Sequence, residues 1–392
     1  MIERERHLRW VSFTRSSFPV SCRLWVCLQP SLHSFPERPD FYVKGVNALR
    51  ISQKVTRKLI TLALIVILSA IFAATAPSFL KLRNVQEILR VAAYTGIICV
   101  GVSFVLIGGG IDLSSGGIIC FTGIIACRLA MLGLPWPVIL LAAVVVGAAC
   151  GFFNGWLITH FYLNDFITTL ATGFVFSGFG LLVIAKEPNG TVMSQTITNR
   201  GFLVLGKHVG GFYYIVIAWI LLTLVAWFIQ TRTRYGLHTC ATGSNAKSSE
   251  MSGVNVKRMK ISTFTICGAC CAVGAVFTVA YQQTAYLSLG SGMGFDAVAA
   301  CVVGGVMLGG GKGDAIGAFL GAVFMTLVTN GIRKYGLDTS WQYVFEGAVI
   351  LIAIMSDAGF AVISARRLRA LSEKNANEEA LLEARAKGGS AQ

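Results

Sequence analysis

The sequence predicts an all-helical integral membrane protein, from its composition and from its apolar pattern. Hydrophobic residues make up 55% of the 392 residues, charged residues make up 13%, and the mean hydropathy is +0.68. Runs such as 59–75 and 137–158 are almost continuously apolar, and a helix needs about 20 such residues to cross a bilayer. Because backbone groups in lipid must bond within their own segment, helices are the expected form of these runs.

About ten such segments follow one another along the chain. They cover 59–75, 88–107, 117–133, 137–158, 166–185, 212–230, 261–281, 296–309, 314–332 and 343–363. An even number of spans places both termini on one side, and lysines and arginines before the first span, after the last and in the loop 231–260 predict that this side is cytoplasmic. The opposite side is not free of basic residues; it carries Lys81, Arg83, Lys186, Arg200, Lys207, Arg333 and Lys334.

The two ends of the chain differ from the transmembrane region, which is predicted over 51–365. Residues 1–50 are rich in arginine and proline without sustained periodicity, which predicts a disordered basic extension. A native cytoplasmic tail and an artefact of an upstream start site both stay open. Residues 366–392 are predicted to form a cytoplasmic C-terminal tail.

The distribution of charge argues against nucleic-acid binding, and the positions of the cysteines argue against a metal or cofactor site. The net charge of +15 comes from basic residues in loops and tails without interleaved aromatic residues, which is typical of membrane topology rather than of nucleic-acid binding. Most of the 11 cysteines lie in apolar segments. Cys267 and Cys270 form a CxxC pair with no His, Asp or Glu beside it, so we expect neither a metal site nor a cofactor.

Small residues recur at helical spacing within the spans. Gly147, Gly151 and Gly155 are four residues apart and share one helix face. Such a face permits close contact between helix backbones, so we expect a tightly packed bundle.

Signatures of catalysis are missing from the sequence. It contains no HExxH and no GxSxG pattern. The stretch "VMLGGGKGD" resembles a P-loop, but Val306 stands where a P-loop has glycine and Gly313 where it has Ser or Thr. We therefore expect a protein that is not an enzyme.

Two polar stretches are not explained by packing. In "GGGIDLSSGG", residues 108–117, glycines permit a re-entrant turn, and Asp112 is expected to accept backbone N–H bonds from Ser114 and Ser115 as a structural cap. A gate or a solute contact is the alternative role. In the loop 231–260, a turn precedes a short predicted helix over 246–251, which indicates either a docking element for a soluble partner or a plain solvated loop.

These stretches also carry a family resemblance. "GGGIDLSSGGIICFTG", "GSNAKSSEMSGVNVKRMKIS" and "GFDAVAACVVGGVMLGGGKGDAIGAFLGA" resemble successive signatures of the permease subunits of ribose-type ABC sugar importers. The resemblance runs from about Leu59 to Ile363 in the same order and spacing. It implies a pore subunit that imports a sugar or sugar-like solute across the bacterial inner membrane, driven by ATP that a partner subunit binds.

The resemblance also implies partners and a coupling loop. The partners are a cytoplasmic ABC-type ATPase, an external solute-binding protein on the loops 186–211 and 282–295, a second permease subunit that is identical or related, and membrane lipid. The loop that contacts the ATPase would comprise Ala246, Lys247, Ser248, Ser249, Glu250, Met251, Ser252 and Gly253. Other family members commonly have Ala-Ala where Ser248 and Ser249 stand.

Polar or aromatic groups within the spans are candidates for the solute path. They are Phe121, Thr122, Asn164, Thr168, Thr169, Thr172, Gln282 and Gln283. Each has a structural alternative, because threonine hydroxyls in membrane helices commonly bond their own turn. Two other classes stay open: an ion-coupled secondary transporter, for which Glu346 is the best coupling carboxylate, and an interaction or scaffold protein without an ATPase.

Overall fold

The computed structural model describes residues 40–76, 78–184, 195–286, 288–338, 340–345, 347–349, 351–352, 355 and 359. Most of the predicted N-terminal extension, the predicted C-terminal tail, the segment 185–194 and Glu346 lie outside the described residues. The chain divides into two units, Met1–Arg50 and Ile51–Gln392. Every helix from α2 onward belongs to the second unit.

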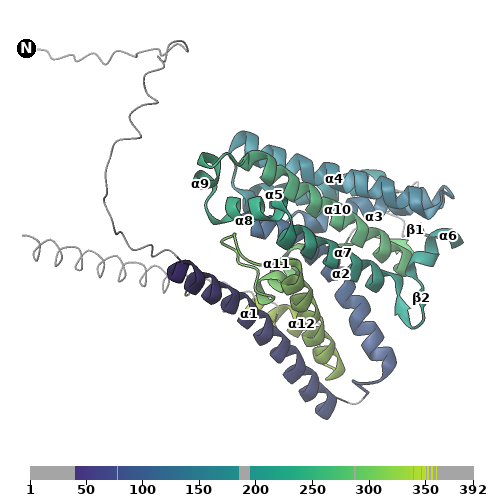
Figure 1. Cartoon of the computed structure of the whole chain (residues 1–392). Helices are drawn as coiled ribbons and strands as arrows, with labels where there is room; N and C mark the ends of the chain where they lie inside the picture. Colours follow the sequence, from purple (N-terminus) through teal and green to yellow (C-terminus); the bar gives the residue numbers. More distant parts are fainter. Residues whose placement is uncertain are drawn as a thin grey trace, which may run out of the picture. The chain divides into compact units, whose positions relative to one another are not determined.

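In the described part of the chain, seven helices are long and apolar enough to cross a membrane (Figure 1). They are α1 (Asp40–Thr75, apolar from Arg57), α2 (Leu82–Ile107), α4 (Trp136–Phe161), α5 (Asp165–Val183), α7 (Tyr214–Arg232), α10 (Val256–Gln282) and α12 (Ala315–Lys334). Two shorter apolar helices are α3 (Ser115–Met131) and α11 (Met293–Val303). The predicted all-α membrane fold is confirmed, and these nine helices correspond to nine of the ten predicted spans.

Short elements connect the long helices at the two ends of the bundle. At one end α8 (Arg234–Ser244) and α9 (Ala246–Met251) link α7 to α10. At the other end lie α6 (Arg200–Leu203), η2 (Val204–Gly206) and a hairpin of β2 (His208–Val209) and β3 (Phe212–Tyr213). There β1 (Gln195–Thr196) pairs antiparallel with β4 (Thr284–Ala285). Since α9 and α6 lie at opposite ends of the bundle (Figure 1), we call these the α9 end and the far end.

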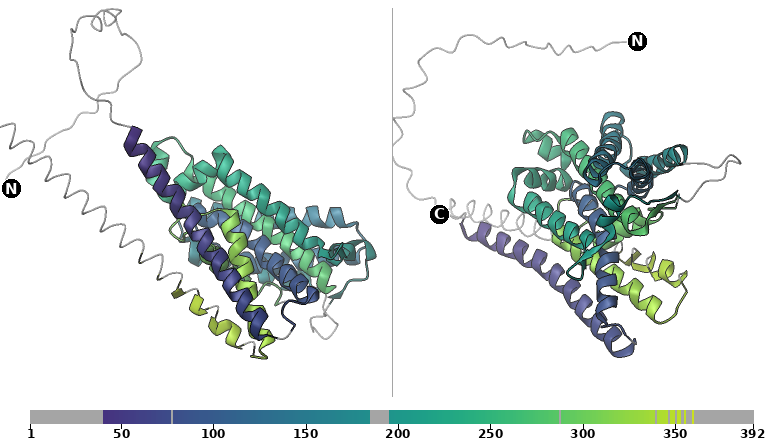
Figure 2. Two further views of the ribbon diagram at one scale, coloured as in Figure 1. Left: turned by 60° about the horizontal axis from the view of Figure 1, so that its bottom comes forward. Right: turned by 90° about the vertical axis from the view of Figure 1, so that its right-hand side faces the viewer.

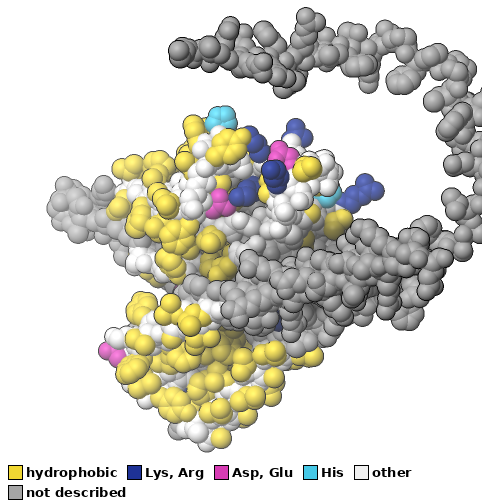
Figure 3. Space-filling view, turned by 90° about the vertical axis from the view of Figure 1, so that its left-hand side faces the viewer, with side chains coloured by type: hydrophobic (Ala, Val, Ile, Leu, Met, Phe, Trp, Pro, Cys, Tyr) yellow, Lys and Arg dark blue, Asp and Glu magenta, His cyan; other side chains and the backbone are white. Residues whose placement is uncertain are grey.

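The core of the bundle is formed by α2 and α10. In the apolar stretch of α2, 83% of the residues are buried, and in that of α10 78% are. The corresponding share is 11% in α1 and 28% in each of α4 and α5. The outer helices therefore present apolar side chains outward, as Figure 3 shows on one face. A surface of this kind is stable when lipid rather than water surrounds it.

Glycines bring α4 and α10 into backbone contact. A Cβ atom on Gly147 would overlap the carbonyl oxygen of Gly268, and one on Gly151 would overlap that of Phe264. The predicted packing role of the glycines on this span is therefore confirmed. The same geometry joins α11 to α12, where Gly304 meets Gly317.

The chain between α2 and α3 is a re-entrant segment, as predicted. It runs along α5: Gly110 lies beside Asp165 at the start of that helix, and Ser114 lies beside Gly173. Eight helical residues correspond to about 12 Å, so α3 begins well inside the bundle. The start of α11 lies beside it, because Gly294 contacts Leu113.

The eighth predicted span, 296–309, is longer than the helix found there. α11 ends at Val303, and Gly305 follows with a φ of +90°. The apolar residues from Val306 to Leu308 continue the hydrophobic pattern of the predicted span. The left-handed backbone conformation at Gly305 nevertheless ends the helix.

The first helix packs on the α12 side of the bundle (Figure 2). The hydroxyl of Thr61 donates to the carbonyl of Val303 at 3.0 Å, and Lys58 pairs with Asp314, the residue that caps α12. The aromatic ring of Phe72 lies against Gly331.

Candidate functional site

The short helix α9 is an exposed element at the α9 end. Asn245 caps it, because its side-chain oxygen accepts a hydrogen bond from the Ser248 N–H at 2.9 Å. Ser249 is the one residue of α9 that is buried, and Met251 is 83% exposed. Gly253 follows with a φ of +86°, a conformation that glycine adopts without strain. The helix covers the residues for which the sequence predicts one, and an exposed apolar Met on a helix is suited to a partner's groove.

The preceding helix α8 is anchored to the core. The hydroxyls of Tyr235 and Ser262 lie 2.8 Å apart, and the rings of Tyr235 and Phe104 have centroids 6.2 Å apart. These contacts tie α8 to α10 and to α2. Burial raises the pKa of Tyr235 above its ordinary value. The buried tyrosine therefore holds α8 against α10 and α2.

Four glycines from three distant segments meet where α8 ends; we call Gly109, Gly243, Gly310 and Gly311 the glycine junction. A Cβ on Gly243 would overlap the carbonyl oxygen of Ile107 and lie 2.7 Å from the Gly311 nitrogen and 2.9 Å from the Gly109 nitrogen. The other three glycines have φ values of +73° to +79°. The Gly311 N–H donates to the Ile107 carbonyl at 2.8 Å.

The glycine junction joins the end of α8, which precedes α9, to two loops of the bundle. Its partners are the turn that leads from α2 to α3 and the loop that leads from α11 to α12. Because backbone touches backbone there, no flexible side chain is available to absorb a displacement of α8. Sequence reasoning missed this contact, although two runs of three glycines, 108–110 and 309–311, signal backbones that come close to something.

Asp112 lies in the re-entrant segment and is fully buried. Its Oδ1 accepts hydrogen bonds from the Ser114 N–H at 2.9 Å and from the Ser114 hydroxyl at 2.6 Å. The Ser115 hydroxyl donates to the backbone carbonyl of Asp112 at 3.2 Å. A hydrogen bond from the Ser115 N–H to the carboxylate, which we expected, is not among those of the described residues.

The candidate solute-path residues do not form one site. Asn164 caps α5 next to Asp165, which contacts Lys260 near the start of α10 at 3.1 Å, whereas Gln282 is the last residue of α10. Lys260 and Gln282 are 22 helical residues apart, about 33 Å. The candidates therefore span the length of the bundle.

Three of the candidate threonines bond backbone carbonyls of their own helices. The Thr122 hydroxyl donates to Ile118, that of Thr169 to Asp165 and that of Thr172 to Thr169. Thr168 is buried as well. Phe121 packs against Phe179 with ring centroids 5.9 Å apart. These contacts are the structural alternative, and a role in the solute path stays a prediction.

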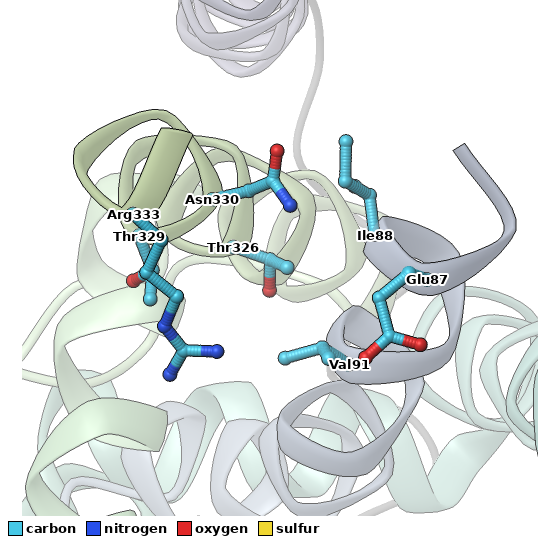
Figure 4. Close-up of a pocket in the computed structure, with 7 residues that line it drawn as sticks. All are labelled: Glu87, Ile88, Val91, Thr326, Thr329, Asn330 and Arg333. Atoms are coloured by element: carbon cyan, nitrogen blue, oxygen red, sulfur yellow. The ribbon is translucent and has the colours of Figure 1, made fainter. Parts of the chain in front are cut away.

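Two pockets at the far end differ in size. One lies between α2 and α12 with Glu87 and Arg333 at its sides (Figure 4), and its volume of about 20 Å³ admits about one water molecule. The other, of about 420 Å³, is lined by Arg200, Lys207, Tyr281 and Gln283 among others. Only the second has room for a sugar-sized group or for a side chain of a docked protein.

A bundle of long apolar helices with two shorter ones, α3 and α11, and an exposed short helix at one end is the architecture of a multi-pass membrane protein. Residues 84–354 match the family described as the permease component of the branched-chain amino acid transport system, and the chain belongs to this family.

Curated relatives cover most of the chain. It is 30% identical over 299 residues to the ribose import permease protein of Escherichia coli (strain K12), a match that covers 76% of this chain and 92% of the relative. It is 31% identical over 308 residues to the galactose/methyl galactoside import permease protein of Haemophilus influenzae, covering 75% and 92%. It is 29% identical over 365 residues to the xylose transport system permease protein of E. coli (strain K12), covering 77% and 93%. No solved structure matches the chain.

Proposed function

We propose that this chain is the pore-forming permease subunit of an ATP-driven importer for a sugar or sugar-like solute in a bacterial inner membrane. The observation that carries the proposal is the set of sugar permeases that align with about three quarters of the chain. They favour an importer of this kind over the ion-coupled transporter. The exposed helix α9 and the glycine junction beneath it fit a subunit that receives its driving force from a partner.

The proposed work of the chain is conformational. ATP binds to a partner ATPase that docks on α9, and α9 transmits the movement through α8. The glycine junction passes this movement to the turn before α3 and to the loop before α12, since their backbones touch. The shorter helices α3 and α11, which start inside the bundle, are the parts that such a movement re-orients.

The charges near the starts of α3 and α11 favour an uncharged solute. α3 and α11 begin next to each other inside the bundle, and helix N-termini attract anionic groups such as a carboxylate. Here the chain supplies the acids itself: Asp112 lies before α3 and Asp296 lies in the first turn of α11. A neutral sugar is therefore a better fit than an amino acid with its own carboxylate.

The far end is the proposed docking face for the external solute-binding protein. The structure describes Lys81, Arg83, Arg200, Lys207, Arg333 and Lys334 at the helix ends and loops of this side. These residues depart from the usual distribution of positive charge in membrane proteins, and an acidic surface on the partner would explain them. A second permease subunit completes the pore.

The test is a pull-down of the intact chain from its own membranes in mild detergent, with mass spectrometry of the proteins that accompany it. We expect an ABC-type ATPase and a solute-binding protein. Met251→Asp places a charge on the exposed side of α9 and should abolish recovery of the ATPase, because an apolar contact would have to bury that charge. The matched control is Val209→Asp, an exposed apolar residue (53%) at the far end, which should leave recovery of the ATPase unchanged.

Two results would overturn the proposal. One is the absence of an ATPase in repeated crosslinked pull-downs of the wild-type chain. The other is uptake that persists without ATP and collapses on addition of a protonophore.

A further inference from the structure

Two buried side-chain oxygens next to the start of α3 have no N–H or O–H donor within hydrogen-bond distance among the described residues. They are Asp112 Oδ2 and Asn154 Oδ1, and both residues are 0% exposed. The two groups are neighbours, because each hydrogen-bonds to the same hydroxyl, that of Ser114. A buried acceptor without a donor costs about 1–3 kcal/mol, and more when it is charged. A pair of them at one place points to a ligand.

The hydrogen bonds determine which atom of the Asn154 amide is left over. The Ser114 hydroxyl donates its proton to Asp112 Oδ1 at 2.6 Å, so only a donor can approach the same oxygen from Asn154. The amide nitrogen Nδ2 does so at 2.7 Å. The amide oxygen therefore stays free for a positively charged or hydrogen-bonding group.

The surrounding charges do not neutralise Asp112. The nearby acid Asp165 is paired with Lys260 at 3.1 Å, so that pair has no positive charge to spare. The thiol of Cys267 donates a hydrogen bond to the Asp112 carboxylate, but a thiol is a weak donor and carries no positive charge. The start of α3 helps through the Ser114 N–H, which is directed at the other oxygen, Oδ1.

We propose that Asp112 Oδ2 and Asn154 Oδ1 bind a small monovalent cation, Na⁺ or K⁺, between the re-entrant segment and α4. Carboxylate and amide oxygens are hard ligands that suit such ions. The cation neutralises Asp112 and holds the turn between α2 and α3 against α4. It is resident and structural, it is not the transported solute, and its binding does not depend on which solute is carried.

The site differs from a transition-metal centre. Within the described residues, there is no group of three or more His, Cys, Asp or Glu side chains that could hold such a metal. One carboxylate and one amide give the low ligand charge that a monovalent ion requires.

The experiment measures the melting temperature of the purified full-length chain in detergent, by tryptophan fluorescence. Chloride salts of Na⁺, K⁺ and N-methylglucamine are compared at equal ionic strength. We expect Na⁺ or K⁺ to raise the melting temperature by about 3 °C or more over N-methylglucamine, with saturation, because a ligand that binds the folded state stabilises it. The wild-type chain alone decides this first step.

Three variants then locate the effect. Asp112→Asn and Asn154→Leu should each lose the cation-dependent increase, and Asp112→Asn should melt in N-methylglucamine no lower than the wild type because it removes the uncompensated charge. Glu250→Gln is the control, since it removes an exposed acid on α9 and neither of the two oxygens, and it should keep the increase.

Each other outcome overturns the proposal. A wild-type chain that does not distinguish the salts has no such site. A melting temperature that rises with falling pH in N-methylglucamine, while Na⁺ and K⁺ add nothing, means that a proton on Asp112 replaces the cation. A cation effect that survives in Asp112→Asn lies elsewhere in the chain. None of these results bears on whether an ATPase is the partner.

Discussion

Gly243 is the residue of α8 that contacts the backbone of two other segments. The Ile107 carbonyl and the Gly109 and Gly311 nitrogens all surround the position of its missing side chain. A methyl group there would have to displace backbone rather than a flexible side chain, and such overpacking typically costs about 1–3 kcal/mol.

We predict that Gly243→Ala separates ATP hydrolysis from transport. The methyl group should push α8 away from the turn before α3, so that movement of α9 is no longer transmitted. The measurement is the ratio of solute imported to ATP hydrolysed in proteoliposomes that contain the complete transporter. The control is Gly309→Ala in one of the partner loops, where a Cβ has no atom within 4 Å. An unchanged ratio in a folded Gly243→Ala complex would contradict the role of the junction.

At the scale of elements, α4 and α10 behave as one unit because glycines join their backbones along the crossing. Gly147 and Gly151 on α4 face Gly268 and Phe264 on α10. Association of helices in lipid depends on such close packing, since lipid tails are as apolar as the side chains. The pair therefore provides a closely packed wall on which α3 lies.

We predict that Gly151→Ala destabilises the chain, whereas Gly178→Ala does not. The first methyl group would overlap the Phe264 carbonyl oxygen; the second, on α5, has no atom within 4 Å. Alanine also favours a helix over glycine by up to about 1 kcal/mol, so the control should melt at the same temperature as the wild type or higher. Melting temperature and monodisperse yield in detergent check both variants. Equal losses in the two variants would refute the proposed contact between backbones.

At the scale of the whole molecule, the two ends of the bundle differ in what they can bind. The α9 end carries an exposed short helix, and the far end carries basic residues and a pocket of about 420 Å³. An importer needs this polarity, because its solute arrives on one side and its energy on the other.

The corresponding prediction concerns topology. GFP and alkaline phosphatase are fused separately after Gly253 and after Gln392. GFP should be fluorescent and alkaline phosphatase inactive at both positions, because both are predicted to be cytoplasmic. A fusion after Gly210, in the turn between β2 and β3, should give the reverse. Phosphatase activity at the C-terminus together with fluorescence after Gly253 would mean an odd number of spans after α9.

The sequence predicts the helices better than the site. Lipid imposes a length of about 20 apolar residues on each full span, so the apolar parts of α2 and α4 can be read from composition, although α2 begins at Leu82 rather than at the predicted residue 88. The contact of Gly109 with Gly243 and Gly310 joins residues more than 100 positions apart, and no local pattern contains it. Asn154 shows the same limit: it is one polar residue in an apolar run, and only the fold brings it to Ser114.

The shortness of α11 has a consequence for how the protein is made. Its 11 residues extend about 16 Å, roughly half of the hydrocarbon thickness of about 30 Å. A nascent segment of this length cannot be held across the bilayer by itself when it leaves the insertion machinery. Backbone contacts hold α11 against α12, because Gly304 touches Gly317 and Ala300 touches Gly321. We therefore expect α11 to enter the membrane together with α12 as a hairpin, late in synthesis, so that the pore is completed only after the rest of the bundle is in place.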